Sequence, residues 1–489
     1  MSKSNKKINI VYSELNSGIV TGSNNYLEIK VNNKTTNIML DCGAVQSGKL
    51  NMKQSFIANK INRNMSDVDH VLITHAHIDH TQGLCQLSRL DFNGTIYMTE
   101  LTSKLFEYLS ADGIKIHESD VKCLTKYNQK KGTKIEPYMD MRSRQYAIDR
   151  TRCYGYNTWI KLEDGIQAKF IPNSHVSGSA SVVIEVSDGY EKETILYMSD
   201  TGCKRDIPYT MPLDIEKMKI TTAIIESTYG DVYIPQREEK DLIEDIYKMI
   251  KETCIENKGR LMIPVFAFAR STNLAYYIKK TYEKYPELNE IPVKMISPLM
   301  DKCHIEISKG KEFYSEKWKN EMDLFTWDKI QHITDGKSIE SAIKNQDSCV
   351  MLASSGMGDN GISTTLLPEI IKNKKNMVCF VGYCAENTTG YKLITGKQKT
   401  ITSNIDGKKE TIRVRSKVDN ISGLSSHASG FEIIRELLTA EKKKMKNVII
   451  VHGDDKSGRP QGLKKMVEDA YSNPVNVYIP KSGQKIKLT

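Results

Sequence analysis

The chain has 489 residues, enough for two to four domains with sizeable cores. Hydrophobic residues make up 39% and charged residues 27%, an ordinary balance for a globular protein, and no apolar run approaches the roughly 18 residues that would span a bilayer. The composition therefore excludes a membrane-spanning protein, and the net charge of +10 hints at a polyanionic partner, although lysine runs are more often solvated surfaces.

The first part of the chain, residues 1–211, is rich in short apolar strands and poor in long helices. The strand candidates are INIVY, YLEIKV, TNIML, HVLIT, TIYMT, NTWIKL, QAKFIP, SVVIEV and TILYMSD. This pattern predicts a core built from one sheet packed on another. The start, MSKSNKKINIVYSEL, has lysines but no apolar segment behind them, so no signal peptide is expected and the predicted location is the cytoplasm.

From residue 212 the pattern changes to an alternation of helices and buried strands. An amphipathic stretch, KDLIEDIYKMIKETC, precedes RLMIPVFA, and PVKMIS, DSCVMLAS and MVCFVGY follow farther along the chain. Such alternation is typical of a parallel-sheet domain. Residues 396–489 return to strand-like segments and close with two helix–strand units. We therefore predict an α/β domain, 212–395, inserted between two parts of another domain, 1–211 and 396–489.

The strongest chemical signal is HAHIDH, which directly follows the strand HVLIT. His75 and His77 project to the same side of an extended segment, so both can bind one metal ion. Asp79 and His80, where the chain turns into a helix, can reach a second ion nearby. Three histidines and a carboxylate within six residues predict a metal site.

Four further polar residues follow apolar strands, where such folds gather functional side chains. They are Asp41, His175, Asp200 and His452. Any one of them alone is more often a turn former or a satisfied polar residue. Together they supply one more histidine for each ion and a carboxylate to bridge the two. The ten cysteines include no CxxC pair, which argues against a thiolate zinc site.

With these residues in hand, nearly the whole chain resembles the β-CASP branch of the metallo-β-lactamase superfamily. Within this branch, the chain resembles the endonuclease subunit of the cleavage and polyadenylation specificity factor and its bacterial and archaeal homologues. LDCGAVQSG, HAHIDH, NSHVSGSA and YMSDTG resemble the superfamily's four motifs, and IESTYG, ISGLSSHAS and VHGDD resemble the three branch motifs. The resemblance implies the αβ/βα sandwich of the superfamily with an inserted α/β β-CASP domain.

The resemblance also implies the roles of individual residues. One ion would bind His75, His77, His175 and Asp200, and the other would bind Asp79, His80, Asp200 and His452. Asp41 would orient a ligand histidine by hydrogen bonding. Imidazole and carboxylate ligands suit zinc best, with manganese or iron as alternatives. His427 would be the general acid with Glu226 holding its ring, and Asp79 counts among the catalytic residues as well as the ligands.

The implied activity is hydrolysis of single-stranded RNA that leaves 5′-phosphate and 3′-hydroxyl ends, by internal cleavage with 5′-to-3′ exonuclease activity left open. Ser354, Ser355 and Gly356 of LASSGM are candidates for phosphate contacts, with an ordinary tight turn as the equal alternative. Arg270 of PVFAFAR is a further substrate-binding candidate. The chain departs from the family pattern at Ser429, where bacterial relatives usually have aspartate, and at Ala269, where glycine is usual.

Two alternatives remain open. The first is a DNA nuclease of the same branch, but DNA-processing members tend to lack a histidine at the third branch motif, where this chain has His452. The second is a catalytically silent processing scaffold, which the complete set of ligands disfavours. Partners other than RNA, a second copy of the chain or subunits of a processing complex, stay undecided by the sequence.

Overall fold

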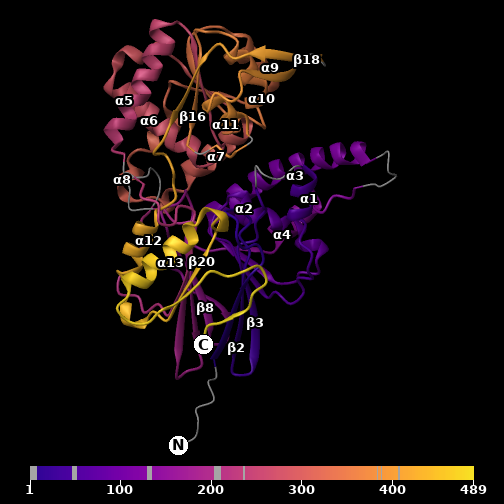
Figure 1. The fold of residues 1–489 in the computed structure, drawn as a ribbon, viewed down its shortest axis with the longest axis vertical. Coiled ribbons are helices and arrows are strands. Elements are labelled where there is room, and N and C mark those ends of the chain that lie inside the picture. The colour runs from indigo at the N-terminus through magenta and orange to yellow at the C-terminus, as the bar shows by residue number, and fades with distance from the viewer. Residues whose placement is uncertain are drawn as a thin grey trace, which may run out of the picture. The chain divides into compact units, whose positions relative to one another are not determined.

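A computed structural model of the chain describes residues 8–46, 52–128, 135–202, 211–234, 237–382, 384–386, 388–405 and 408–489. Contacts within the chain divide it into two compact units (Figure 1). Unit 1 comprises Met1–Ile234, Glu312–Ser315 and Ser426–Thr489, and unit 2 comprises Pro235–Lys311 and Glu316–Ser425. The limits 212 and 395 of the inserted domain stay a prediction; they differ from the limits of unit 2, which begins at Pro235 and ends at Ser425.

Unit 1 contains two sheets of seven described strands each. The first has the order β22, β1, β2, β3, β4, β5, β6, with the bounds Ile486–Lys487, Ile8–Glu14, Asn25–Val31, Lys34–Leu40, His70–Leu72, Thr95–Met98 and Thr151–Cys153. Strands β22 to β3 pair antiparallel, and β3 to β6 pair parallel. A two-residue turn joins the antiparallel strands β2 and β3, whereas parallel neighbours need the longer crossovers that separate β3 to β6.

The second sheet of unit 1 has the order β21, β20, β11, β10, β9, β8, β7. The bounds of these strands are Asn476–Tyr478, Asn447–Val451, Thr222–Glu226, Lys192–Ser199, Ala180–Ser187, Ile166–Pro172 and Ile160–Glu163. Strands β7 to β10 pair antiparallel, and β10, β11, β20 and β21 pair parallel. Consequently β8, β10, β11 and β20 all point in one direction, so their carboxyl ends lie at one edge of the sheet.

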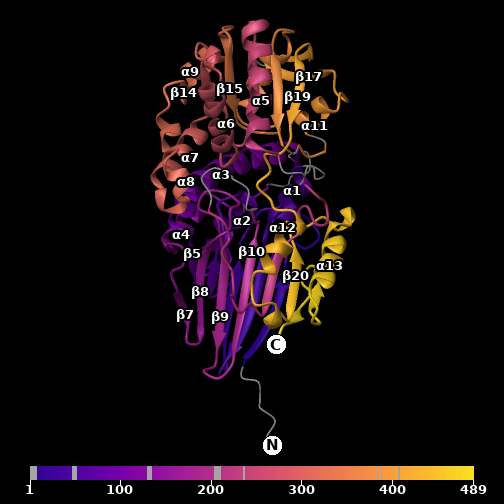
Figure 2. The same cartoon turned by 90° about the vertical axis from the view of Figure 1, so that its left-hand side faces the viewer.

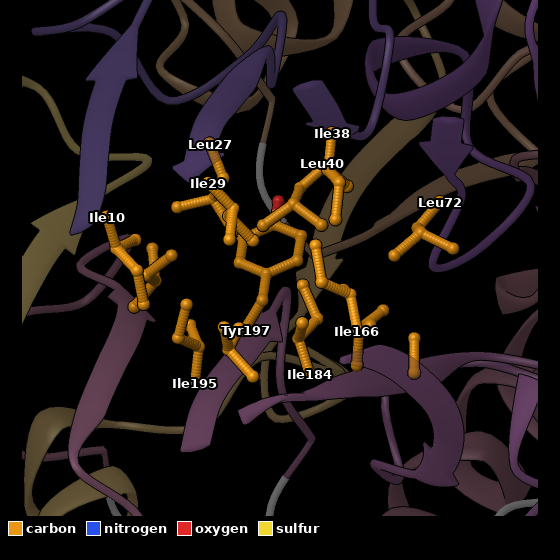
Figure 3. Close-up of a cluster of buried hydrophobic side chains, with 14 of the residues drawn as sticks. Ile10, Leu27, Ile29, Ile38, Leu40, Leu72, Ile166, Ile184, Ile195 and Tyr197 are labelled. Atoms are coloured by element: carbon orange, nitrogen blue, oxygen red, sulfur yellow. The ribbon is translucent and has the colours of Figure 1, made fainter. Parts of the chain in front are cut away.

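The two sheets pack face to face through a core of side chains from both of them (Figure 3). Alternation along each strand assigns the faces: Ile195 and Tyr197 of β10 enter this core, while Leu196 and Met198 enter the core on the other face of the sheet. The apolar segments singled out in the sequence form these strands. The layers confirm the predicted αβ/βα sandwich.

Helices cover the outer face of each sheet of unit 1. Side chains of α3, α4 and the 3-10 helix η1 pack on the first sheet, and those of α12 and α13 pack on the second. The ribbons of α12 and α13 run beside β20 (Figures 1 and 2). The bounds of the helices of unit 1 are Met52–Asn59 (α1), Ile78–Thr81 (α2), Gln82–Arg89 (η1), Glu100–Asn128 (α3), Met141–Asp149 (α4), Gly430–Leu437 (α12) and Arg459–Ala470 (α13). The sequence predicted few long helices in residues 1–211, and this prediction is wrong for α3, which has 29 residues.

Unit 2 is a parallel α/β domain, as the alternation of its segments predicts. Its six-stranded sheet, counted over the described residues, has the order β14, β13, β15, β12, β16, β19, and all pairs are parallel. The strand bounds are Ile330–Ile333, Val293–Ile296, Cys349–Ala353, Arg260–Pro264, Met377–Val381 and Lys417–Ile421, and an antiparallel pair, β17 and β18, spans Thr400–Ile405 and Lys408–Arg413.

The helices of unit 2 connect these strands. Their bounds are Glu239–Ile250 (α5), Arg270–Lys284 (α6), Pro298–Lys309 (α7), Glu316–Lys319 (α8), Gly336–Lys344 (α9), Ser363–Ile371 (α10) and Thr389–Ile394 (α11) (Figure 2). Among the described residues of the whole chain, no helix combines the length and the apolar character that crossing a membrane requires.

Candidate metal centre

The predicted site residues of unit 1 lie at the carboxyl ends of strands in its two sheets. In the first sheet, Asp41 directly follows β3, and His75 to His80 follow β4. In the second, the segments that follow β8, β10 and β20 carry His175, Asp200 and His452, and Glu226 ends β11. Because carboxyl ends of parallel strands share an edge, the fold gathers these residues from distant parts of the sequence.

Four residues at this edge have a left-handed backbone. Their φ angles are 61° at Asp41, 59° at Ser174, 57° at Ser199 and 53° at His452. For residues other than glycine this region is sparsely populated, and such conformations concentrate at functional sites. Each one turns the chain sharply at the point where the strand ends, next to or at a predicted ligand.

The first ligand group contains His75, His77, His175 and Asp200, whose ligand atoms lie within 4.8 Å of one another. Nδ1 of His77 is 3.0 Å from Nε2 of His75 and 3.4 Å from Nε2 of His175. Oδ2 of Asp200 lies 3.8 Å from Nε2 of His75 and 3.7 Å from Nε2 of His175. Burial lowers the pKa of all three histidines, that of His77 to about 4, so their rings are neutral near pH 7.

The second group contains Asp79, His80 and His452, again within 4.8 Å. Asp200 reaches this group too, since Nε2 of His80 is 3.3 Å from its Oδ2 and Nε2 of His452 is 3.4 Å from its Oδ1. One carboxylate therefore touches both groups. Burial disfavours a charge on Asp200, but the neighbouring histidines, His452 first, more than compensate and hold its pKa well below the usual range.

These atoms fit divalent ions. Two nitrogen ligands about 2.0–2.1 Å from a tetrahedral zinc ion stand about 3.3–3.4 Å apart, close to the separations among His75, His77 and His175. Within the described part of the chain, Nε2 of His80, Nε2 of His452 and Oδ1 of Asp200 are buried and make no hydrogen bond. Buried polar atoms are normally satisfied, so three that converge indicate a shared cation. Neutral imidazoles and ionised carboxylates are the forms that bind metal.

Asp41 supports the second group from behind. Its fully buried carboxylate accepts from Nδ1 of His80 at 2.8 Å, which leaves Nε2 of that ring for an ion. Three hydroxyl groups and one amide also donate to Asp41, namely those of Thr74, Ser199 and Tyr197, and the amide of Thr74. The resemblance implies such a carboxylate behind a ligand histidine; the role of His80 as a ligand stays a prediction.

Several residues that no sequence motif indicates hold the site in place. The Tyr197 hydroxyl donates to Oδ2 of Asp41 at 2.7 Å from inside an apolar strand. Thr228 contacts Nδ1 of His452 at 3.2 Å, and the Thr201 amide donates to Oε1 of Glu226 at 2.6 Å. The one available signal was a tyrosine at a core-facing position of β10, because a buried phenol needs a polar partner.

Glu226 and His427 form a pair beside the ligand groups. Oε2 of Glu226 is 2.9 Å from Nδ1 of His427, and Glu226 is buried. Both belong to a third set of close atoms, with Asp200, that lie within 4.8 Å of one another. Burial lowers the pKa of His427, but the surrounding carboxylates, Glu226 first and then Asp200 and Asp79, together raise it to about 9, so the ring is charged near pH 7. Ser429, a departure from the family pattern, caps α12 through a capping box with Glu432.

Three of the four substrate-binding candidates of unit 2 are consecutive and directly follow β15, and the fourth, Arg270, begins α6 after β12. The Ser354 hydroxyl donates to Oγ of Ser297 at 3.0 Å, and the Ser355 amide donates to the Asn360 carbonyl at 3.1 Å, as in a tight turn. Gly356 lies against Phe266. Substrate contacts by these three residues stay a prediction.

Arg270, the fourth candidate, donates from Nη1 to the Val381 carbonyl at 2.9 Å, inside unit 2. It follows Ala269, whose φ is 63°, a conformation that favours glycine. The turn explains why glycine is usual there, and the alanine makes it at a cost in strain. A role of Arg270 in substrate binding stays a prediction.

Comparison with known families gives three matching models along the chain. Residues 272–393 match the Beta-Casp domain, and residues 411–480 match the Zn-dependent metallo-hydrolase RNA specificity domain. These matches support the resemblance to the β-CASP family of metallo-β-lactamase-fold proteins. Residues 20–220 match the Anti-Pycsar protein Apyc1 model, a range that contains the first ligand group.

Several curated proteins are similar to this chain. It is 26% identical over 432 residues to transcription termination factor FttA of Methanocaldococcus jannaschii, covering 86% of this chain and 63% of that protein. It is 25% identical over 458 residues to cleavage and polyadenylation specificity factor 73 of Drosophila melanogaster, covering 93% and 62%. It is 27% identical over 463 residues to endoribonuclease ysh1 of Emericella nidulans, covering 87% and 49%.

The chain thus spans about half to three fifths of the length of these relatives. Among solved structures, a protein of unknown function from Enterococcus faecalis V583 superimposes with a TM-score of 0.52. That alignment covers 98% of this chain and all of the other at 13% identity, and it supports the fold.

Proposed function

We propose that this β-CASP protein is a metal-dependent endoribonuclease acting on single-stranded RNA. The observation that carries the proposal is the close grouping of Asp200, Glu226 and His427, which puts a charged imidazole beside the carboxylate shared by both ligand groups. A metal centre alone would suit many hydrolyses, whereas an alkoxide leaving group needs a proton donor. The similar RNA-processing proteins and the match to an RNA specificity domain support RNA as the substrate.

Two divalent ions, zinc first and manganese or iron as alternatives, would be held by the two ligand groups. His75, His77 and His175 would hold one ion, Asp79, His80 and His452 the other, and Asp200 both. When bound, the ions would supply a water molecule of lowered pKa and positive charge opposite the phosphate oxygens.

The protein's own groups would handle the leaving group. Because Glu226 holds Nδ1 of His427, Nε2 is the atom that transfers a proton to the 3′ oxygen. The bond between phosphorus and that oxygen breaks as the water oxygen bonds to phosphorus, which yields a 5′-phosphate and a 3′-hydroxyl. Asp79, the ligand at the more exposed side, would orient the attacking water.

We place the protein in the cytoplasm, and we keep 212–395 as the limits of the inserted domain. A second copy of the chain or processing-complex subunits as partners, and additional 5′-to-3′ exonuclease activity, are further hypotheses.

The test uses matched single-stranded RNA and DNA, each linear and circular, with metal-loaded wild type and His427→Ala. We expect cleavage of circular RNA by the wild type and its loss in the variant, at unchanged metal content. Preference for DNA would favour a DNA nuclease, and cleavage of linear RNA alone would favour an exonuclease. A metal-loaded wild type that cuts nothing would return the chain to the scaffold alternative.

A further inference from the structure

Two large aromatic side chains stand exposed beside one another on unit 1. Tyr233 is 70% exposed and Phe431 is 51% exposed, and their ring centroids lie 6.3 Å apart at an interplanar angle of 79°. An isolated exposed aromatic residue is common on protein surfaces, but an adjacent pair marks a candidate binding surface. We call Tyr233 and Phe431 the aromatic pair.

The aromatic pair is carried by the two segments that also carry the proposed acid and its partner. Tyr233 follows Glu226 by seven residues, and Phe431 follows His427 by four. Four residues of extended chain span at most about 14 Å, so the aromatic pair lies within a few nucleotides of the His427 ring.

A close contact locks these two segments together. The Gly430 amide donates to the Gly230 carbonyl at 2.9 Å, and a Cβ atom on Gly430 would lie 2.1 Å from that oxygen. Nη1 of Arg459 donates to the Thr228 carbonyl at 2.7 Å, which fixes the same segment from α13. The rings of Tyr229 and His427 are 6.2 Å apart. The aromatic pair is therefore held at a fixed distance from the proposed acid.

The charges around the aromatic pair suit a polyanion. Arg435 lies four residues after Phe431 on α12, hence on the same helix face, and its side chain is 58% exposed. Its ion pair with Glu436 is long, 3.9 Å. The carboxylates of the two segments are directed elsewhere: Glu432 closes the capping box of α12, and Asp231 packs against Gly462.

We propose that the aromatic pair binds unpaired bases of single-stranded RNA on the 5′ side of the scissile bond, with Arg435 contacting the backbone. The proposal rests on the proposed function, because His427 as donor to the 3′ oxygen places the upstream nucleotide next to its segment. Aromatic rings stack on any base, so this contact would add affinity with little sequence preference. Two rings beside a guanidinium group suit nucleotides, whereas a protein partner needs a broader apolar patch.

The first experiment measures binding by the full-length chain in chelator, so that the RNA stays intact. The probe is a single-stranded RNA with 2-aminopurine either upstream or downstream of the cleavage site. We expect stacking to quench the upstream probe and Tyr233→Ala or Phe431→Ala to weaken binding roughly tenfold each. Tyr190→Ala is the matched control, because Tyr190 is 88% exposed in the turn between β9 and β10, at the strand ends opposite the metal centre. Quenching of the downstream probe alone would overturn the upstream assignment.

The second experiment separates failure of this inference from failure of the proposed function. Metal-loaded wild type, the double variant Tyr233→Ala with Phe431→Ala, and the control are compared on RNA and on bis(p-nitrophenyl) phosphate. We expect the double variant to raise KM for RNA and to leave hydrolysis of the small diester unchanged, which also shows that it is folded. A wild type without RNA cleavage refutes the function itself. A wild type that cuts RNA, alongside a double variant with the same Kd and KM, refutes only the role of the aromatic pair.

Discussion

Replacing Asp41 by asparagine should weaken metal binding at a group that Asp41 does not itself join. The carboxylate accepts from Nδ1 of His80 at 2.8 Å, from Tyr197 at 2.7 Å and from Ser199 at 3.1 Å, all at Oδ2. An amide offers one acceptor oxygen in place of two and turns an N–H₂ group toward other donors. His80 then loses the partner that keeps its proton on Nδ1, and a proton on Nε2 blocks the ion.

The expected loss is about 10- to 100-fold in affinity for the second ion, or about 1.4–2.7 kcal/mol. Titration of metal-free protein with metal in the presence of a competing chelator measures this affinity. The ion that His75, His77 and His175 would bind serves as an internal reference. Tyr197→Phe is the matched control: it removes one donor but keeps the charge of Asp41, so its effect should be smaller. Asp41→Asn protein that retains the second ion within about twofold would refute an orienting role for this carboxylate.

Three further predictions follow from the geometry. Glu226→Gln keeps an oxygen for Nδ1 of His427 but removes the charge that favours the imidazolium. We therefore expect kcat to fall, but by less than the roughly 10²–10⁴-fold that losing a general acid would cost. An unchanged kcat would contradict the assigned pair. His452→Ala should reduce bound metal from two ions to one per chain by elemental analysis, and retention of both would show that His452 is not a ligand. Burial lowers the pKa of His117 to about 4, so as the pH falls below about 6.5 this histidine is protonated in the unfolded chain before it is protonated in the folded one. The free energy of unfolding, measured with urea, should therefore drop on the order of 1–2 kcal/mol between pH 7 and pH 5. His117→Gln should remove that part of the pH dependence.

The candidate ligands could be proposed from the sequence because metal chemistry restricts the residue types so strongly. His75, His77, Asp79 and His80 lie in one segment, so their proximity needed no knowledge of the fold. His452 is more than 370 residues away, and only the resemblance and its position after an apolar strand indicated that it belongs with them. The structure brings it to 3.4 Å from Asp200.

Other features depend on tertiary contacts that no local pattern encodes. The sequence could not show that Asp41, Ser199 and His452 adopt left-handed backbone conformations, because only the surrounding packing holds such residues there. The sequence did not predict the long helix α3, because its apolar residues form no strong stripe along one helix face and strand-like segments surround it. The sequence showed that Ser429 departs from the family pattern, but not that its hydroxyl caps α12 by accepting from the Glu432 amide.

The position of His452 is set by the same apolar pattern that folds the sandwich. Strand β20 pairs in parallel with β11, so that Val451 lies beside Glu226, and His452 follows at once. Ile449 enters the core between the sheets, and Ile450 enters the core under the helices. A slip of one residue would exchange these faces and carry His452 away from Asp200. Burying each isoleucine contributes about 1.5–3 kcal/mol, so two side chains that never approach the ions enforce the register on which the second ligand group depends.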